Sequence, residues 1–100
     1  MITIIKTHTG VTVEGHACFD AHGRDIVCAG VSTLIQNLIF SFEDLTTDAI
    51  EYKTESGRAV LKYRNLSERG QLLVDSFFVG IKTMSESYPD YIRLIGGDTA

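Results

Sequence analysis

Hydrophobic and polar positions alternate along the first part of the chain. β-branched side chains fill Ile2–Thr7 and Val11–Ala17, and the turn signal His8-Thr9-Gly10 separates the two runs. A period of two is typical of strands with one buried face, so the pattern predicts a β-hairpin. In its second strand, His16 falls at the far end, on the polar face that also carries Glu14. The segment Cys18–Arg24 then loses this period and is predicted to be a loop.

A helical period begins at Ile26. Apolar residues then recur at spacings of three and four: Val27, Val31, Leu34, Ile35, Leu38, Ile39 and Phe42. This stripe predicts an amphipathic helix that ends within Glu43–Asp48. Asp25 directly precedes the stripe and is a residue type that caps helix N-termini. The prediction places Cys28 in the first turn of the helix.

The second half of the chain repeats this plan. Ala49–Thr54 and Arg58–Arg64 flank Glu55-Ser56-Gly57, which predicts a second hairpin. A second helical stripe follows Ser67, a residue suited to cap it, and consists of Leu73, Phe77, Ile81, Met84 and Tyr88.

The chain closes with a stop signal and a short apolar run. Pro89 ends the second helix, and Tyr91–Ile95 is predicted to be a final strand. The order ββαββαβ predicts a single α+β domain over residues 1–100, with a mostly antiparallel sheet packed against two long helices.

Charge and composition narrow the function classes. Nine Lys and Arg against thirteen Asp and Glu give a net charge of −4, without a basic cluster. A nucleic-acid binder needs a basic surface, so we expect no direct nucleic-acid contact; a basic protein or peptide partner is attracted instead.

No run approaches the roughly 18 apolar residues of a membrane span. We therefore expect a soluble cytoplasmic protein with its two cysteines as free thiols. The modest core of so short a chain also leaves a homo-oligomer open.

The stretch GHACFDAHGRDIVCAGVS, residues 15–32, contains two histidines and two cysteines. A thiol at a helix N-terminus meets unpaired N–H groups that favour the thiolate and could hold an oxyanion. Cys28 is therefore a candidate nucleophile. His16, at the end of the preceding strand, is the candidate base that takes the thiol proton.

Other interpretations of these residues remain open. Cys28 alone could be a small buried core residue, and His16 alone a solvated surface histidine. His16, Cys18, His22 and Cys28 together form a ligand set for tetrahedral zinc, although their spacing does not match familiar zinc motifs. A stand-alone redox thiol has little support because the chain has no CxxC motif. Cys18 and His22 are most simply loop residues without a catalytic role.

Gly15-His16-Ala17, followed after a glycine-containing loop by DIVCAGVS over residues 25–32, resembles the ribosomal-processing cysteine protease family, Prp or YsxB-like. The resemblance extends over nearly the whole chain. It departs from the family pattern only slightly: Gly30 stands where a second alanine is common, and Cys18 is an extra thiol in the loop.

This resemblance implies a cysteine endopeptidase that removes the N-terminal extension of large-subunit ribosomal protein twenty-seven. It also implies a homodimer that needs no cofactor, with His16 and Cys28 as the catalytic pair. Asp25 would cap the helix or orient His16. The alternative from another class is a non-catalytic, ribosome-associated protein-binding module with Cys28 in its core.

Overall fold

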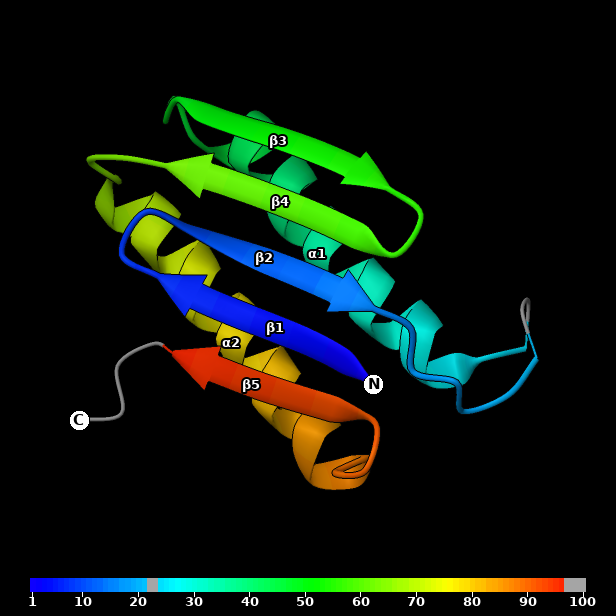
Figure 1. Cartoon of the computed structure of the whole chain (residues 1–100). Coiled ribbons are helices and arrows are strands. Elements are labelled where there is room, and N and C mark those ends of the chain that lie inside the picture. The colour runs from blue at the N-terminus through cyan, green and yellow to red at the C-terminus, as the bar shows by residue number, and fades with distance from the viewer. Residues whose placement is uncertain (22–23, 97–100) are drawn as a thin grey trace.

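The computed structural model describes residues 1–21 and 24–96, and within them the element order is that expected from the sequence (Figure 1). The elements are β1 (Ile2–Thr7), β2 (Gly10–Gly15), α1 (Ile26–Leu45), β3 (Ile50–Glu55), β4 (Arg58–Tyr63), α2 (Glu68–Ser87) and β5 (Ile92–Gly96). The predicted order ββαββαβ is therefore confirmed.

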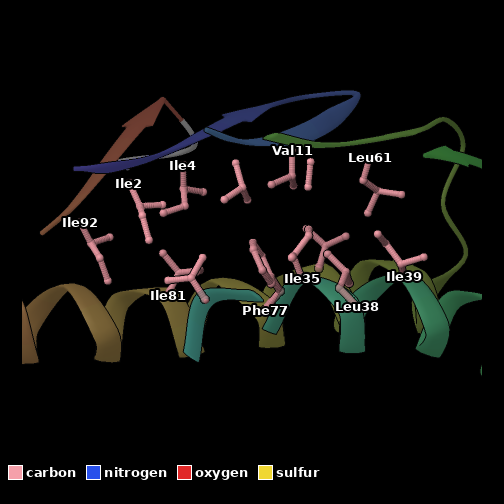
Figure 2. Close-up of a cluster of buried hydrophobic side chains, with 14 of the residues drawn as sticks. Ile2, Ile4, Val11, Ile35, Leu38, Ile39, Leu61, Phe77, Ile81 and Ile92 are labelled. Carbon is pink, nitrogen blue, oxygen red and sulfur yellow. The ribbon is translucent and has the colours of Figure 1, made fainter. Parts of the chain in front are cut away.

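The strands form one five-stranded sheet with the spatial order β3-β4-β2-β1-β5. Three neighbouring pairs are antiparallel, and only β1 and β5 run parallel. Both helices cover the same face of the sheet, so the molecule has two layers (Figures 1 and 2). The prediction of an α+β fold with a mostly antiparallel sheet is confirmed.

The core lies between the sheet and the helices. Figure 2 shows side chains from the inner face of the strands, such as Ile4 and Leu61, meeting Ile39 of α1 and Ile81 of α2. Ile4, Leu61 and Ile81 have no solvent-exposed surface. Each buried side chain of this size stabilises the fold by about 1.5–3 kcal/mol relative to its exposed state. The apolar stripes of both helices are thus used to hold them on the sheet.

Helix α1 is more apolar than the sequence pattern suggested. Its 20 residues include an 18-residue window of mean hydropathy 1.5, which is long and apolar enough for a membrane span by composition. The expectation that no segment reaches this threshold was therefore wrong. In the fold, Val27, Ile35 and Phe42 of this helix are buried against the sheet and α2. One third of the window is buried in the fold, while Ile26 and Phe40 of the same helix remain exposed.

The strand limits differ from the predicted ones by one or two residues. The second strand ends at Gly15 instead of Ala17, because Gly15 has a φ of +92°, which ends the extended conformation. Strands β3 and β5 begin and end one residue later than predicted, and β4 ends one residue earlier. The early end of β2 determines where His16 lies.

One end of the sheet gathers several chain segments (Figure 1). There β2 ends, the β3–β4 hairpin turns, α1 begins and α2 ends close to the start of β5. The residues that the sequence singled out for catalysis lie at this end.

Candidate active site

The backbones of Gly15 and Gly57 determine where the imidazole of His16 lies. The N–H of Gly15 donates a hydrogen bond of 2.8 Å to the carbonyl of Gly57 in the β3–β4 turn. The imidazole of His16 lies against this turn, since a Cβ atom built on Gly57 would be only 2.8 Å from His16 Nε2. Gly57 has a φ of +75°, a conformation that favours glycine. The turn therefore fixes His16 by both its hydrogen bond and its lack of a side chain.

The expectation that His16 lies on the outer polar face with Glu14 was wrong. Because the strand ends at Gly15, the alternation of side chains stops before His16. His16 instead lines a cleft on the helix side of the sheet, together with Val13 of the inner face. Gly15 thus ends the alternation, and the exposed His16 borders the cleft instead of the outer face beside Glu14.

Cys28 lies in the first turn of α1, as predicted, and lines the same cleft as His16. Its side chain is half-buried. The cleft has a volume of about 290 Å³, and Val31, Ile35 and Ala59 provide apolar walls. The structure therefore brings the two predicted catalytic residues to one cavity, with an apolar surface beside them.

Asp25 caps α1, and its carboxylate ties the helix start to the preceding loop. Oδ1 accepts hydrogen bonds from the amides of Val27 at 3.0 Å and Cys28 at 2.9 Å, while Oδ2 accepts one from Phe19 at 2.9 Å. The bond from the Cys28 amide, partly opposed by desolvation and reinforced by that from Phe19, lowers the pKa of Asp25. The carboxylate is therefore ionised at neutral pH.

Asp25 makes no hydrogen bond to His16 within the described ranges 1–21 and 24–96. Of the two roles expected from the sequence, capping is the one that its contacts display.

Three amides at the start of α1 are already hydrogen-bonded to Asp25. Val27 and Cys28 donate to the side chain of Asp25, and the Ala29 amide donates to its carbonyl at 3.0 Å. These contacts do not support the expectation that the helix start holds the reaction's oxyanion, which stays a prediction.

A different backbone amide reaches the nucleophile. The N–H of Ala17 donates to Cys28 Sγ at 3.3 Å, and Ala17 itself is buried. The next residue, Cys18, is exposed and has a φ of 57°, so the chain turns sharply away from the cleft after Ala17. Cys18 does not line the cleft.

The zinc interpretation depends on a residue that the structure does not describe. His22 lies outside the described residues. Among the residues that are described, no group of three or more His, Cys, Asp or Glu side chains could hold a metal ion.

Three features of the site were not found by sequence reasoning. They are the Ala17 amide, the β3–β4 turn at Gly57 and the aromatic contacts of Phe19. Only Gly57 left a signal, as the glycine of a predicted hairpin turn. A backbone amide carries no residue-type signature, and the partners of Phe19 are about seventy positions away in the sequence.

Comparison with known proteins shows the family of this chain. The family model described as cysteine protease Prp matches residues 1–93. The ribosomal processing cysteine protease Prp of Mycoplasma pneumoniae is 31% identical over 94 residues, which cover 92% of this chain and 91% of the relative.

Two crystal structures of the ribosomal processing protease Prp from S. aureus share the fold. The first, with a covalently linked product peptide, has a TM-score of 0.87 at 28% identity and covers 95% of this chain and 98% of that one. The second, with a substrate peptide, has a TM-score of 0.78 at 25% identity and covers 93% and 94% of the two chains. The chain therefore belongs to the Prp family of ribosomal processing cysteine proteases.

Proposed function

We propose that this cysteine protease uses Cys28 as nucleophile and His16 as general base to remove the N-terminal extension of large-subunit ribosomal protein twenty-seven. The observation that carries the proposal is that the side chains of Cys28 and His16 line the same cleft. The S. aureus relative with a covalently linked product peptide supports a covalent route for this family.

The reaction begins with a proton transfer. His16 takes the proton of the Cys28 thiol, and the thiolate forms a bond to the carbonyl carbon of the scissile peptide. The electron pair of the carbonyl moves to oxygen and returns as the C–N bond breaks, and the imidazolium gives its proton to the leaving amine. Water, deprotonated by His16, then hydrolyses the thioester and releases the acid and the free thiol.

The substrate fits the chemistry of this protein in two respects. The net charge of −4 attracts a basic ribosomal protein over long range. The cleft beside the reacting bond is also bordered by the exposed polar residues Ser32, Gln36 and Arg58, which offer contacts to an extended peptide above a nearly buried apolar floor. The proposal places the reaction in the cytoplasm, where ribosomal proteins are made and the cysteines stay reduced.

The alternative, a non-catalytic binding module, requires Cys28 to be a core residue. Its side chain is only half-buried and borders the cleft, which favours the catalytic role. Site-resolved alkylation at neutral pH separates the two functions, because a thiol paired with a base reacts faster than an inert one. The proposed function expects Cys28 to react faster than the exposed Cys18.

The direct test is cleavage of a peptide spanning the junction between the extension and the mature ribosomal protein. We expect wild-type protein to cleave it, and Cys28→Ala and His16→Ala to lose activity by at least a thousandfold. Cys18→Ala is the matched control, since this cysteine is outside the cleft lining, and should retain activity. Cleavage that persists in Cys28→Ala would contradict the nucleophile assignment.

We further propose that the protein acts as a homodimer. Exposed apolar side chains on the helices support this, since Leu72 and Val79 of α2 are 68% and 67% exposed. Sedimentation equilibrium over a range of concentrations tests it; a mass of 11.0 kDa at all concentrations would contradict it.

A further inference from the structure

The peptide between β2 and α1 is anchored at three points before residue 22. Ala17 is buried with its amide on Cys28 Sγ, and the Phe19 amide donates to Asp25 Oδ2. The Phe19 ring packs edge-on against Tyr88 and Tyr91, with centroid distances of 5.6 Å and 5.1 Å. Edge-to-face aromatic pairs of this kind are directional as well as apolar.

These anchors lie on both sides of Cys18, whose φ of 57° is strained for a residue with a side chain. A strained residue persists only where its neighbours hold it in place. The contacts of Phe19 provide that hold on one side, and burial of Ala17 provides it on the other. The strained residue Cys18 thus lies between two anchored residues, directly after the amide that reaches the sulfur.

We propose that the main-chain N–H of Ala17 stabilises the anion of the reaction, first on Cys28 Sγ and then on the carbonyl oxygen bonded to the attacked carbon, and that Phe19 positions this amide. The inference rests on the proposed function, because it needs Cys28 as nucleophile.

Two observations direct the choice to Ala17. The amides of Val27, Cys28 and Ala29 in the first turn of α1 are already hydrogen-bonded to Asp25. The Ala17 amide, by contrast, already donates to the Cys28 sulfur, at 3.3 Å.

In the covalent step, the Ala17 amide changes its partner without changing its position. The Cys28 sulfur carries the negative charge before attack, and the former carbonyl oxygen carries it once the C–S bond has formed. Both atoms are attached to the same carbon in the intermediate, so one N–H beside the sulfur serves each in turn. The charge returns to the nitrogen of the leaving group, which takes the proton from His16 as the C–N bond breaks.

The test replaces one amide by an ester. Cys18 allows a synthetic peptide of residues 1–17, carrying L-lactic acid in place of Ala17, to be ligated to recombinant residues 18–100. This removes the N–H and leaves every side chain of the cleft intact. Loss of a single oxyanion donor slows enzymes by about a hundredfold or more. We expect kcat to fall at least tenfold with KM within threefold of the all-amide ligated protein.

The ester also weakens the His16 carbonyl, which accepts a 2.6 Å hydrogen bond from the Met1 amine. An all-amide ligated protein with desamino-methionine at position 1 controls for this loss and should keep its kcat. The rate of Cys28 alkylation, followed against pH, gives a second measurement. We expect the ester to shift that curve to higher pH, because the thiolate has lost its donor.

Substitutions at Phe19 test its positioning role. Phe19→Ala should lower kcat at least threefold and shift the alkylation curve in the same direction, while Phe19→Tyr retains the ring and should restore both. Tyr52→Ala truncates an exposed aromatic side chain on β3, outside the cleft lining, and should change neither.

The outcomes are distinguishable. An ester protein with kcat within twofold of the amide protein overturns the role of Ala17, and an unchanged Phe19→Ala overturns the role of Phe19, while the Cys28 assignment stands in both cases. Cleavage that survives Cys28→Ala overturns the proposed function and this inference with it.

Discussion

The two helices begin at opposite ends of the sheet, and their first turns are built alike. Asp25 caps α1 and Ser67 caps α2, and in each helix the third residue after the cap donates its amide to the capping side chain. That third residue is Cys28 in α1, at 2.9 Å from Asp25 Oδ1, and Gly70 in α2, at 3.1 Å from Ser67 Oγ.

The surroundings of the two first turns differ. Cys28 borders a cleft, whereas Gly70 is buried and the space where its Cβ would lie is filled by Asp48 Oδ2. Ser67 and Asp48 also bond each other at 2.8 Å, which closes that end of α2. A helix N-terminus alone therefore does not make a site. The cavity and the base that the β3–β4 turn directs into it distinguish the start of α1.

The strongest test of this difference compares one substitution at each position for its effect on kcat and on stability. Cys28→Ser keeps the size of the side chain, so we expect kcat to fall at least a thousandfold while the free energy of unfolding changes by less than about 1 kcal/mol. Gly70→Ala should do the reverse. Its Cβ would overlap Asp48, which costs about 1–3 kcal/mol, while kcat per folded molecule stays within twofold.

Peptide cleavage and urea unfolding measure the two quantities separately. A Gly70→Ala protein that keeps full stability, or a Cys28→Ser protein that keeps activity, would contradict the distinction between a functional and a structural helix start.

The next effect concerns the turn that directs His16. Gly57→Ala places a methyl group where the His16 ring lies, 2.8 Å from Nε2, and forces an alanine into a φ of +75°. The strain costs about 1–2 kcal/mol. We expect kcat to fall roughly tenfold or more as the ring moves, because a small displacement of a catalytic group is costly.

The exposed turn of the other hairpin offers a comparison. Thr9→Ala alters the β1–β2 turn at the far end of the sheet and should leave kcat unchanged. Equal kcat values for Gly57→Ala and wild type would show that the turn does not position His16.

Much of this architecture follows from local pattern. The stripe from Val27 to Phe42 and the caps at Asp25 and Ser67 predict both helices to within a few residues, because helix periodicity and capping are local properties. The pairing of His16 with Cys28 in one cleft needed more, and the motif resemblance supplied it.

The details of the site depend on backbone geometry that residue types do not reveal. The alternation of β2 predicts His16 on the outer face, and only the positive φ of Gly15 places it in the cleft. In the same way, a capping aspartate is easily predicted, but the number of amides it occupies is set by three-dimensional contacts. For that reason the contacts at the start of α1 do not support the oxyanion expectation.

The two caps differ in charge, which gives them different pH dependence. Asp25 has a pKa lowered below its ordinary value of 3.8, so its contribution to stability is present above that value and is lost as the pH falls through the lowered pKa. We expect Asp25→Asn to have a lower Tm than wild type at pH 7, and the difference to disappear under acid conditions.

Ser67→Ala removes a cap that does not titrate. Its cost, about 1 kcal/mol, should be similar from pH 3 to pH 8. Thermal unfolding of both variants across this range measures the contrast. A Tm difference for Asp25→Asn that persists unchanged at pH 2 would show that its charge has no part in capping.

The smallest effect lies on the alkaline side and at the far end of the sheet. Burial, with a further contribution from the Asp75 carboxylate, raises the pKa of Tyr63 above its ordinary value of 10.0. The neutral phenol is favoured in the fold, so its contribution to stability is complete below pH 10 and declines as the pH rises through the raised pKa.

Tyr63→Phe keeps the ring stacked on Phe42, at 6.1 Å between centroids, and should show a shallower loss of stability above pH 10. Tyr52→Phe, at an exposed tyrosine, is the matched control and should follow the wild-type curve. Identical alkaline unfolding curves for Tyr63→Phe and wild type would mean that the phenol ionises equally in the folded and unfolded chains. The stability of the protein would then depend on pH through the Asp25 cap of α1 and not through Tyr63.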